Sequence, residues 1–475
     1  MKSVSIIWVW IKRLLLLYLL YVVVFSIVIY YIPKHVTTTV EPSSFYQEDI
    51  GPDEIALVEH PQDAFSRRVE LIRSAKQNLD VCYHNLKAGQ TADCFIGELI
   101  MAADRGVHVR LLLDGTLGGL SGEHKDLELA LCSHPNVEYR PYNPVNLIKP
   151  WDFNVMLHDK FIIVDDAMLM LGGRNIGDEY FDPPMYEDAV TNDRDVVIIN
   201  TRAHTKQGKN SVIYEVQNYM EELWNSDRTV VADKLSKAKE EKGKQVQQQL
   251  RELCKSWQQR YPEYYLPKVS VKSIAVPTNK VTLLHNPLDG YKKEPVIGAT
   301  LARLLQDCKE VTIQTPYATA NRHTLQELQT MTTDANVTML TNSMASSPNY
   351  PAFSNYVSQR KKFLQTGIDI YEYQSTDSIH GKSCIGDDRL AVVGSFNLDD
   401  RSLYIDTESV LVVDSVPFQK QLKQEMQTLL DHSARVMENN TYDTSDDVKI
   451  LDVSKGKKCL MTMVSIFSRI FQCLI

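Results

Sequence analysis

The first strong pattern in the chain is an apolar run near its N-terminus. Residues 14–32 contain no charged side chain, and these nineteen residues are enough to cross a bilayer as a helix. Lys12 and Arg13 precede the run, whereas acidic side chains dominate the stretch after it, so the N-terminus is expected in the cytoplasm. We therefore expect residues 1–33 to form a cytoplasmic stub and a single-pass transmembrane helix in the cell membrane, with the catalytic domain on the extracytoplasmic side. A cleaved signal peptide is the alternative, but no small-x-small cleavage pattern follows the run.

Beyond this run, apolar positions alternate between helical and strand spacing. In the first half, helical spacing covers 64–77 and 95–104, and strand spacing covers 79–83 and 107–113. The second half repeats this order, which indicates an internal duplication. Its segments are helices at 297–306, 325–331 and 356–364 and strands at 311–314, 337–342 and 368–371. Such alternation predicts an α/β fold in which mostly parallel or mixed sheets are flanked by helices.

Breaks in these patterns divide the chain into segments. We expect a polar tether at 34–54, a first lobe at 55–227 and a second lobe at 269–440. Residues 228–268 between the lobes are rich in Lys, Glu and Gln, which predicts an exposed, charged helix. The tail at 441–475 has an apolar segment after a group of lysines, and this fits an amphipathic helix in the plane of a membrane. A terminal helix packed on the protein is the alternative.

The composition fits a two-lobed globular chain. Its 475 residues exceed what one hydrophobic core usually organises. The net charge of −9 lacks the basic footprint of a nucleic-acid-binding protein, so no nucleic-acid partner is expected. The eight cysteines have no metal-like spacing, and we interpret them as buried thiols. We therefore expect neither a metal nor another cofactor.

The strongest chemical signal is a pattern that occurs twice. The paired positions are His158 and His380, Lys160 and Lys382, Asp165 and Asp387, Gly173 and Ser395, and Asn175 and Asn397. Each pair is separated by the same 222 residues. A single H-x-K sequence matches by chance, but two copies of so long a pattern are hard to dismiss. We therefore predict one site to which both lobes contribute.

The residue types in each copy suit a phosphate diester. An imidazole can act as a nucleophile or as a proton donor. A lysine two residues later on a strand lies on the same face as the histidine. Glycine lets the backbone approach an anion, and asparagine offers amide donors. Two such half-sites that face each other make one complete anion site.

This paired motif resembles that of the phospholipase D superfamily, in which each of two halves gives a His, a Lys and an Asn to one site. The sequences after the motifs, 172–181 and 394–402, are similar to bacterial cardiolipin synthases of the C-type branch, as are 102–107 and 315–317. The resemblance implies two duplicated phospholipase D-like lobes. It also implies a membrane location and phospholipid substrates, of which phosphatidylglycerol is the leading candidate.

The resemblance further implies roles for the repeated residues. His158 is expected to attack phosphorus and form a phosphohistidine, and His380 is expected to act as the acid and then the base. The residues expected to hold the phosphate oxygens are Lys160, Lys382, Asn175, Asn397, Ser395 and the backbone of Gly173.

Four acidic residues complete the predicted site. Asp165 and Asp387 lie at the far ends of their strands, so they are expected to be structural or orienting rather than reactive. Glu408 and Asp195 are candidates to orient the two histidines.

The expected reaction is transfer of a phosphatidyl group between two phosphatidylglycerols, which gives cardiolipin and glycerol. Hydrolysis of phospholipids and a membrane-bound nuclease of the same superfamily are the enzymatic alternatives. A catalytically idle membrane scaffold is the third, although a scaffold has no need of two intact histidine motifs.

Overall fold

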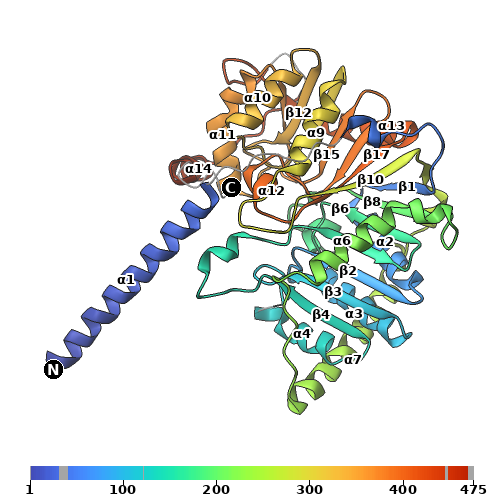
Figure 1. Ribbon diagram of the computed structural model, residues 1–475, viewed down its shortest axis with the longest axis vertical. Helices are drawn as coiled ribbons and strands as arrows, with labels where there is room; N and C mark the ends of the chain where they lie inside the picture. The colour runs from blue at the N-terminus through green and yellow to red at the C-terminus, as the bar shows by residue number, and fades with distance from the viewer. Residues whose placement is uncertain (1, 32–40, 121, 444–447, 469–475) are drawn as a thin grey trace.

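The computed structural model describes residues 2–31, 41–120, 122–443 and 448–468. Its first element, α1 (Lys2–Tyr31), projects from a two-lobed body (Figure 1). Within α1, Ile6–Tyr30 is long and apolar enough to cross a membrane, and no other helix in the described ranges passes that test. The helix begins earlier than the predicted run because the apolar residues before Lys12 continue the same helix.

The first lobe is built on a mixed sheet with the strand order β4-β3-β2-β5-β6-β8-β1-β9. Only the pairs among β2, β3 and β4 are parallel. Its strands are β1 (Asp53–Val58), β2 (Asn78–Tyr83), β3 (His108–Asp114), β4 (Val137–Tyr142), β5 (Lys160–Val164), β6 (Met168–Gly172), β8 (Asp195–Asn200) and β9 (Val276–Pro277). Its helices are α2 (Pro61–Ser74), α3 (Gln90–Asp104), α4 (Lys125–Cys132), α5 (Asp178–Phe181), α6 (Val212–Trp224), α7 (Lys237–Arg260) and α8 (Pro262–Tyr265).

The second lobe repeats this sheet with the order β10-β17-β16-β15-β11-β12-β13-β18. Its strands are β10 (Lys280–His285), β11 (Glu310–Gln314), β12 (Asn336–Asn342), β13 (Asp369–Tyr373), β15 (Lys382–Gly386), β16 (Leu390–Gly394), β17 (Ser409–Asp414) and β18 (Ser433–Val436). Its helices are α9 (Val296–Gln306), α10 (Arg322–Met331), α11 (Tyr350–Leu364), α12 (Asp400–Tyr404) and α13 (Val416–Leu430), followed by α14 (Lys455–Ser468). Short 3-10 turns cover Pro42–Phe45, Gly122–His124, Pro150–Asn154, Gln207–Asn210 and Val271–Ser273.

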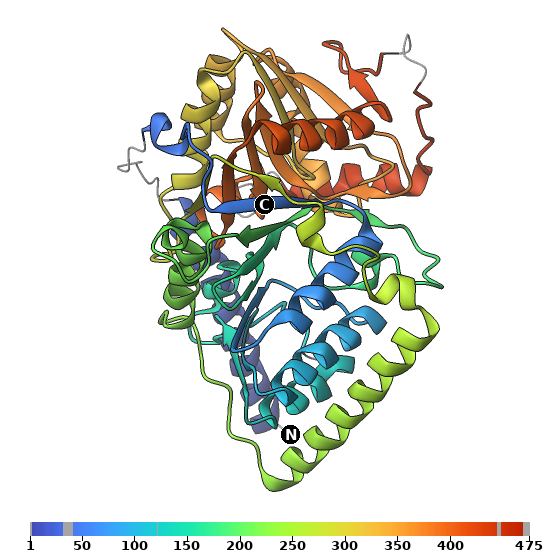
Figure 2. The same cartoon turned by 90° about the vertical axis from the view of Figure 1, so that its right-hand side faces the viewer.

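The strand that follows each histidine is buried on both faces. In β5, Ile162 and Val164 pack into the core of the first lobe, whereas Phe161 and Ile163 pack into a core shared by both lobes. In β15, Cys384 packs into the second-lobe core, and Ile385 packs into the shared core. A strand covered on both faces reads as a continuous apolar run, which is why these segments are so apolar. The shared core holds the lobes together, one above the other in Figure 2.

The segment between the lobes differs from its prediction. Helix α7 is not a solvated helix, because it packs along α3 and α4 of the first lobe. Its buried face includes Leu250, Cys254 and Trp257. β9, which follows at Val276–Pro277, pairs with β1 in the first sheet although it lies within the range predicted for the second lobe. The charged residues of α7 lie on its outer side, and its few apolar residues determine which face packs on the first lobe.

The two ends of the chain are also packed more than predicted. Of the expected tether, residues 34–40 lie outside the described part, while Phe45 is buried in the second-lobe core. The tail helix α14 packs against α11, where Met461 is buried and its carbonyl accepts a hydrogen bond from Ser354. The remainder of the predicted amphipathic segment, 469–475, also lies outside the described residues. Among the described cysteines, most are buried as expected, but Cys459 is exposed.

Candidate active site

Each repeated motif sets its histidine just before a strand and its lysine at the first residue of that strand. β5 begins at Lys160 and β15 begins at Lys382. The Lys160 ammonium donates to the carbonyl of His158, and the Lys382 ammonium donates to the carbonyl of His380 at 2.5 Å. The ammonium of Lys382 also lies 3.1 Å from Nε2 of His380. Both lysines are buried, so the two positive charges are held beside the histidine rings.

Asp165 and Asp387 lie at the opposite ends of these strands, in left-handed turns with φ of 48° and 47°. The Asp165 carboxylate accepts hydrogen bonds from the backbone N–H groups of residues 76, 77 and 78 at 2.9–3.1 Å. The Asp387 carboxylate accepts two equivalent bonds, from residues 309 and 310. These contacts tie the starts of β2 and β11 to the motif strands. The geometry is that of structural residues rather than reactive ones.

The two lobes exchange acidic side chains at the histidines. Nδ1 of His158 lies 2.9 Å from Oε1 of Glu408, which belongs to the second lobe. Nδ1 of His380 lies 2.5 Å from Oδ2 of Asp193, which belongs to the first lobe. With Nδ1 facing a carboxyl group, the proton is assigned to Nδ1 in each ring and Nε2 carries the lone pair, while the Lys382 ammonium lies 2.6 Å from Nδ1 of His380 as well.

The backbone segments beside the two histidines also pair with the opposite lobe. β14 (Ser378–Ile379), just before His380, pairs in parallel with β7 (Thr191–Asn192), just before Asp193. Leu157 forms the matching bridge with Thr407 in the other half. Each histidine is therefore fixed by backbone and side chain of the opposite lobe. The two motifs form a single composite site.

Of the two acids expected to orient the histidines, Asp195 does not contact a histidine in the described residues. Its carboxylate pairs with the buried guanidinium groups of Arg68 and Arg174, each at 3.0 Å. The sheet register identifies the correct residue. In the first lobe, Gly172 of β6 pairs with Asp195, and Asp193 lies two residues before that partner. In the second lobe, the equivalent Gly394 of β16 pairs with Val410, and Glu408 lies two residues before that partner. Asp193 and Glu408 therefore occupy equivalent positions.

The fourth repeated position, Gly173 and Ser395, differs between the lobes, and its role differs from the predicted phosphate contact. A Cβ at Gly173 would lie 2.3 Å from Oδ1 of Asp193, so only glycine leaves room for that carboxylate. The N–H of Gly173 is already bonded to the carbonyl of Arg194. At the matching place, the Ser395 hydroxyl donates to Oε2 of Glu408. Both residues therefore position the acids that hold the histidines.

The paired asparagines retain unused hydrogen-bonding capacity. Asn175 donates to the hydroxyl of Tyr180 at 3.3 Å, whereas its side-chain oxygen is buried without a partner in the described residues. The side-chain oxygen of Asn397 is likewise buried and unpartnered within that part of the chain. Because an Asn can exchange its amide N and O by a flip, each can turn donors toward a ligand. Buried polar atoms left unpaired are costly, and a bound phosphate group can satisfy them.

Burial and the adjacent lysines control protonation. Burial, reinforced by Lys160, lowers the pKa of His158 well below its ordinary value. Burial and Lys382 lower the pKa of His380 to about 4, but Asp193 opposes this shift. Burial alone would raise the pKa of Asp193, yet Lys382 and His380 reverse the effect and hold it at about 2. Burial raises the pKa of Glu408 well above its ordinary value.

The lysines respond to the same burial. Desolvation lowers the pKa of Lys382 to about 7, and it lowers the pKa of Lys160 as well. An anionic ligand beside these groups would favour their charged forms and raise the pKa again. The site is therefore poised to take up an anion together with protons.

Two cavities reach the histidines from different sides. One, with a volume of about 340 Å³, is lined by His158, His84, Asn397 and Arg401 among others. The other, of about 610 Å³, is lined by His380, Tyr180, Tyr186 and Lys87 among others. Both are also lined by Tyr317 and Asn349. The site can thus receive groups from two directions that meet near one aromatic residue.

Sequence reasoning missed three rings beside the histidines, and one of them, Tyr180, lies edge-on to His380 with centroids 5.7 Å apart. The His84 ring lies edge-on to His158 with centroids 5.0 Å apart, and its Nδ1 is 2.8 Å from the carbonyl of Leu157. The Tyr317 ring lies edge-on to His380 with centroids 5.9 Å apart. His84 gave no signal because it does not recur in the repeated motif. In the described ranges, no group of His, Cys, Asp and Glu side chains is arranged to hold a metal ion.

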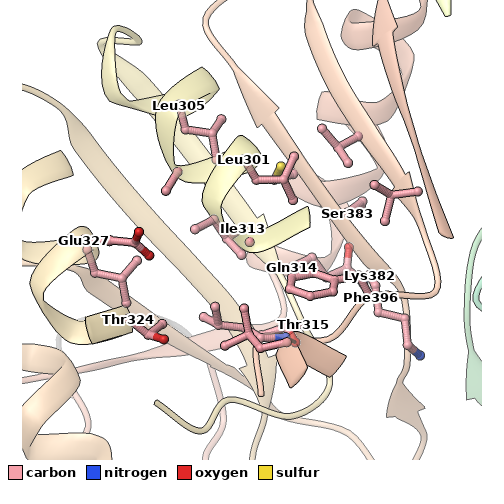
Figure 3. Close-up of a pocket in the computed structure, with 18 of the residues that line it drawn as sticks. Leu301, Leu305, Ile313, Gln314, Thr315, Thr324, Glu327, Lys382, Ser383 and Phe396 are labelled. Carbon is pink, nitrogen blue, oxygen red and sulfur yellow. Dashed lines mark hydrogen bonds between the residues drawn. The ribbon is translucent and has the colours of Figure 1, made fainter. Parts of the chain in front are cut away.

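A separate apolar cavity lies behind the second motif, under α9 and α10 (Figure 3). Leu301, Leu305, Ile313 and Phe396 line it, and Lys382 lies at one edge. Its volume of about 90 Å³ is below the roughly 150 Å³ of an apolar cavity that holds one benzene molecule. It is therefore too small for a whole acyl chain.

The fold and the site define a duplicated α/β protein with one composite site of two His, two Lys and two Asn residues. The chain belongs to the phospholipase D-like family: the family model described as "Cardiolipin synthase, PLD-like domain" matches residues 69–224 and 301–430.

Individual relatives agree with this assignment. The chain is 27% identical to cardiolipin synthase C of Escherichia coli (strain K12) over 402 residues, covering 75% of this chain and 80% of the relative. It is 26% identical to an uncharacterized protein of Helicobacter pylori (strain J99) over 423 residues, covering 79% and 78%. Among solved structures, phosphatidylserine synthase of Haemophilus influenzae has the same fold, with a TM-score of 0.61 at 16% identity and coverage of 89% and 95%.

Proposed function

We propose that this chain is a phosphatidyltransferase that joins two phospholipids into cardiolipin, with phosphatidylglycerol as donor and acceptor. The observation that carries the proposal is the exchange of acids between the lobes, Glu408 to His158 and Asp193 to His380. Such an exchange directs two imidazoles into one anion site, each with its Nδ1 held by a carboxyl group of the opposite lobe. The similarity to a cardiolipin synthase supports phospholipids as the substrate class.

In the first step, Nε2 of His158 attacks the phosphorus of the donor and forms a phosphatidyl-histidine. His380 protonates the departing glycerol oxygen, so the P–O bond breaks as the N–P bond forms. The ionised Asp193 stabilises the imidazolium of His380, which favours this residue as the acid. Burial raises the pKa of Glu408, which favours its neutral carboxyl form. Glu408 therefore stabilises an imidazolium at His158 less than Asp193 does at His380, and His158 acts as the neutral nucleophile.

In the second step, the neutral His380 removes a proton from a glycerol hydroxyl of the acceptor lipid. That oxygen attacks phosphorus and releases His158, and cardiolipin is formed. Lys160, Lys382, Asn175 and Asn397 hold the non-bridging oxygens, where negative charge develops in both transition states. The two cavities at the histidines give the two alcohol groups separate approaches.

The proposal includes a membrane location. Helix α1 anchors the chain as a single span, and the lobes lie on the extracytoplasmic side. Lys12 and Arg13 then lie at the cytoplasmic face, as the positive-inside rule requires.

Lipid analysis in cells that lack cardiolipin tests the function. We expect the wild-type chain to produce cardiolipin and His158→Ala to produce none. His108→Ala serves as the matched control, because that histidine is exposed and pairs only with Glu138 on the surface. Accumulation of phosphatidic acid without cardiolipin would instead establish a hydrolase. No lipid change, together with DNA degradation that His158→Ala loses, would establish the nuclease.

A further inference from the structure

The loop between β4 and β5, residues 144–154, carries apolar side chains into open space. Val145, Leu147 and Ile148 are 62%, 74% and 80% exposed. An exposed apolar group on a contiguous segment usually marks a contact with a partner or a membrane. In Figure 1 this teal loop extends from the body on the side of α1.

The loop lies along α1, and tyrosine hydroxyls of the helix satisfy its backbone. Tyr18 donates to the carbonyl of Leu147 at 2.8 Å, and Tyr21 donates to the carbonyl of Ile148 at 3.1 Å. Tyr30 donates to the carbonyl of Trp151 at 2.8 Å. Tyr18 precedes Tyr30 by twelve residues, or about 18 Å of helix, so the loop follows α1 well into its apolar segment.

Polar side chains within the loop region satisfy further backbone groups. Oδ1 of Asn146 accepts hydrogen bonds from the N–H groups of Ile148 and Lys149. The Asn143 amide donates to the carbonyls of Asp152 and Val155. An irregular segment has no need of these internal hydrogen bonds in water, because solvent can satisfy its backbone groups. In a bilayer, however, every backbone polar group must find an internal partner.

Aromatic packing fixes the base of the loop against the helix. The Trp151 ring lies 5.3 Å from that of Tyr21 and 5.2 Å from that of Phe25. Tyr30 is buried in a cluster with Val155 and Ile405. The loop and α1 are therefore one packed unit that presents the exposed side chains of Val145, Leu147 and Ile148.

We propose that this loop inserts into the lipid bilayer beside α1 as a second membrane element. The inference rests on the membrane anchor of the proposed function, because a bilayer around α1 surrounds the loop tip as well. The loop leads within four residues to His158, and Arg401, which lines the cavity at His158, donates to the carbonyl of Asn154. Insertion therefore brings that cavity to the membrane surface, where a phospholipid headgroup can enter it.

Spin labels on the full chain in phosphatidylglycerol vesicles test the inference. Labels are placed singly at Ile148→Cys in the loop, Leu16→Cys in α1 and Val416→Cys in α13, after Cys459 and Cys473 are replaced by Ser. Val416 is an exposed aliphatic residue at the start of α13, and this helix lies on the far side of the body from α1 (Figure 1). The parent without an added cysteine gives the background. Accessibility is compared for oxygen, which partitions into lipid, and for a nickel chelate, which stays in water.

We expect the oxygen-to-nickel ratio at 148 to match that at 16 and to exceed that at 416 several-fold. If the label at position 148 has the low ratio of the label at position 416, while the label at position 16 has the ratio of a lipid-embedded group, the inference is overturned and the anchor remains. Shielding of 148 from both reagents means that protein covers the loop, which also overturns it. If 16 is accessible to nickel as well, the anchor fails together with the inference, whereas the lipid analysis above judges the enzymatic function separately.

Discussion

At the scale of single residues, the contrast between Asp193 and Asp195 separates catalysis from stability. Asp193 faces His380. Asp195, only two residues further along the chain, neutralises the buried guanidinium groups of Arg68 and Arg174. The same change, Asp to Asn, therefore has different consequences at neighbouring positions.

Asp193→Asn should lower kcat by about 10²–10⁴-fold while the protein still folds, because an amide favours the wrong tautomer of the histidine it holds. Asp195→Asn should instead lower the yield of folded protein and the thermal midpoint, because it leaves buried positive charge uncompensated. Initial rates of cardiolipin formation and thermal unfolding in detergent check both changes. An Asp193→Asn chain with wild-type kcat would contradict the assigned role.

The pH dependence of kcat/KM should show an acidic optimum. As the pH falls, His158 becomes protonated in the free enzyme and can no longer attack phosphorus; its pKa lies well below the ordinary value, so this loss is confined to acidic pH. As the pH rises through about 7, Lys382 loses the proton that gives it a positive charge, and phosphate binding weakens. We therefore expect kcat/KM to be highest below pH 7 and to fall again only where His158 is protonated.

A Lys382→Arg variant is the control for the alkaline limb. Arginine stays charged, so the decline near pH 7 should vanish even if the maximal rate is lower. An alkaline limb that is identical in both proteins would show that another group causes it.

At the scale of elements, Asp165 and Asp387 hold neighbouring strands in register rather than contribute to the chemistry. Asp165→Asn keeps a residue that tolerates the left-handed turn but removes charged acceptors from three N–H groups. We expect a loss of about 1–3 kcal/mol in stability. Asp387→Asn should cost less, because that carboxylate accepts two such bonds.

Denaturation midpoints and initial rates at low temperature distinguish these effects. Both variants should retain most of their activity below the unfolding transition. A variant with unchanged midpoint but abolished turnover would assign its aspartate to the reaction.

The sequence allowed the duplicated sheets and both motifs to be predicted, because β5 and β15 are apolar on both faces and their histidines recur at one spacing. It did not identify Asp193, because the equivalence with Glu408 depends on sheet register and the two acids lie 215 residues apart instead of 222. The packing of α7 was missed for another reason. Its apolar positions are few, and only the tertiary structure shows that Leu250, Cys254 and Trp257 are buried against the first lobe.

At the scale of the whole molecule, the interface between lobes is the site itself. Arg194 of the first lobe donates to Gln314 and Ser383 of the second lobe at 2.8 and 2.5 Å, beside the exchanged acids. The lobes therefore cannot separate without taking both histidines from their carboxylates. This dependence accounts for a duplication that keeps one intact motif in each half.

The most direct test is to measure the products of the purified full chain in phosphatidylglycerol vesicles, with one histidine variant from each lobe. The account predicts equimolar cardiolipin and glycerol from the wild type, and no detectable product from either His158→Ala or His380→Ala. Phosphatidic acid as the main product would contradict the transfer reaction. Retention of about half the activity in either variant would contradict the single composite site, because two independent sites would each contribute a share.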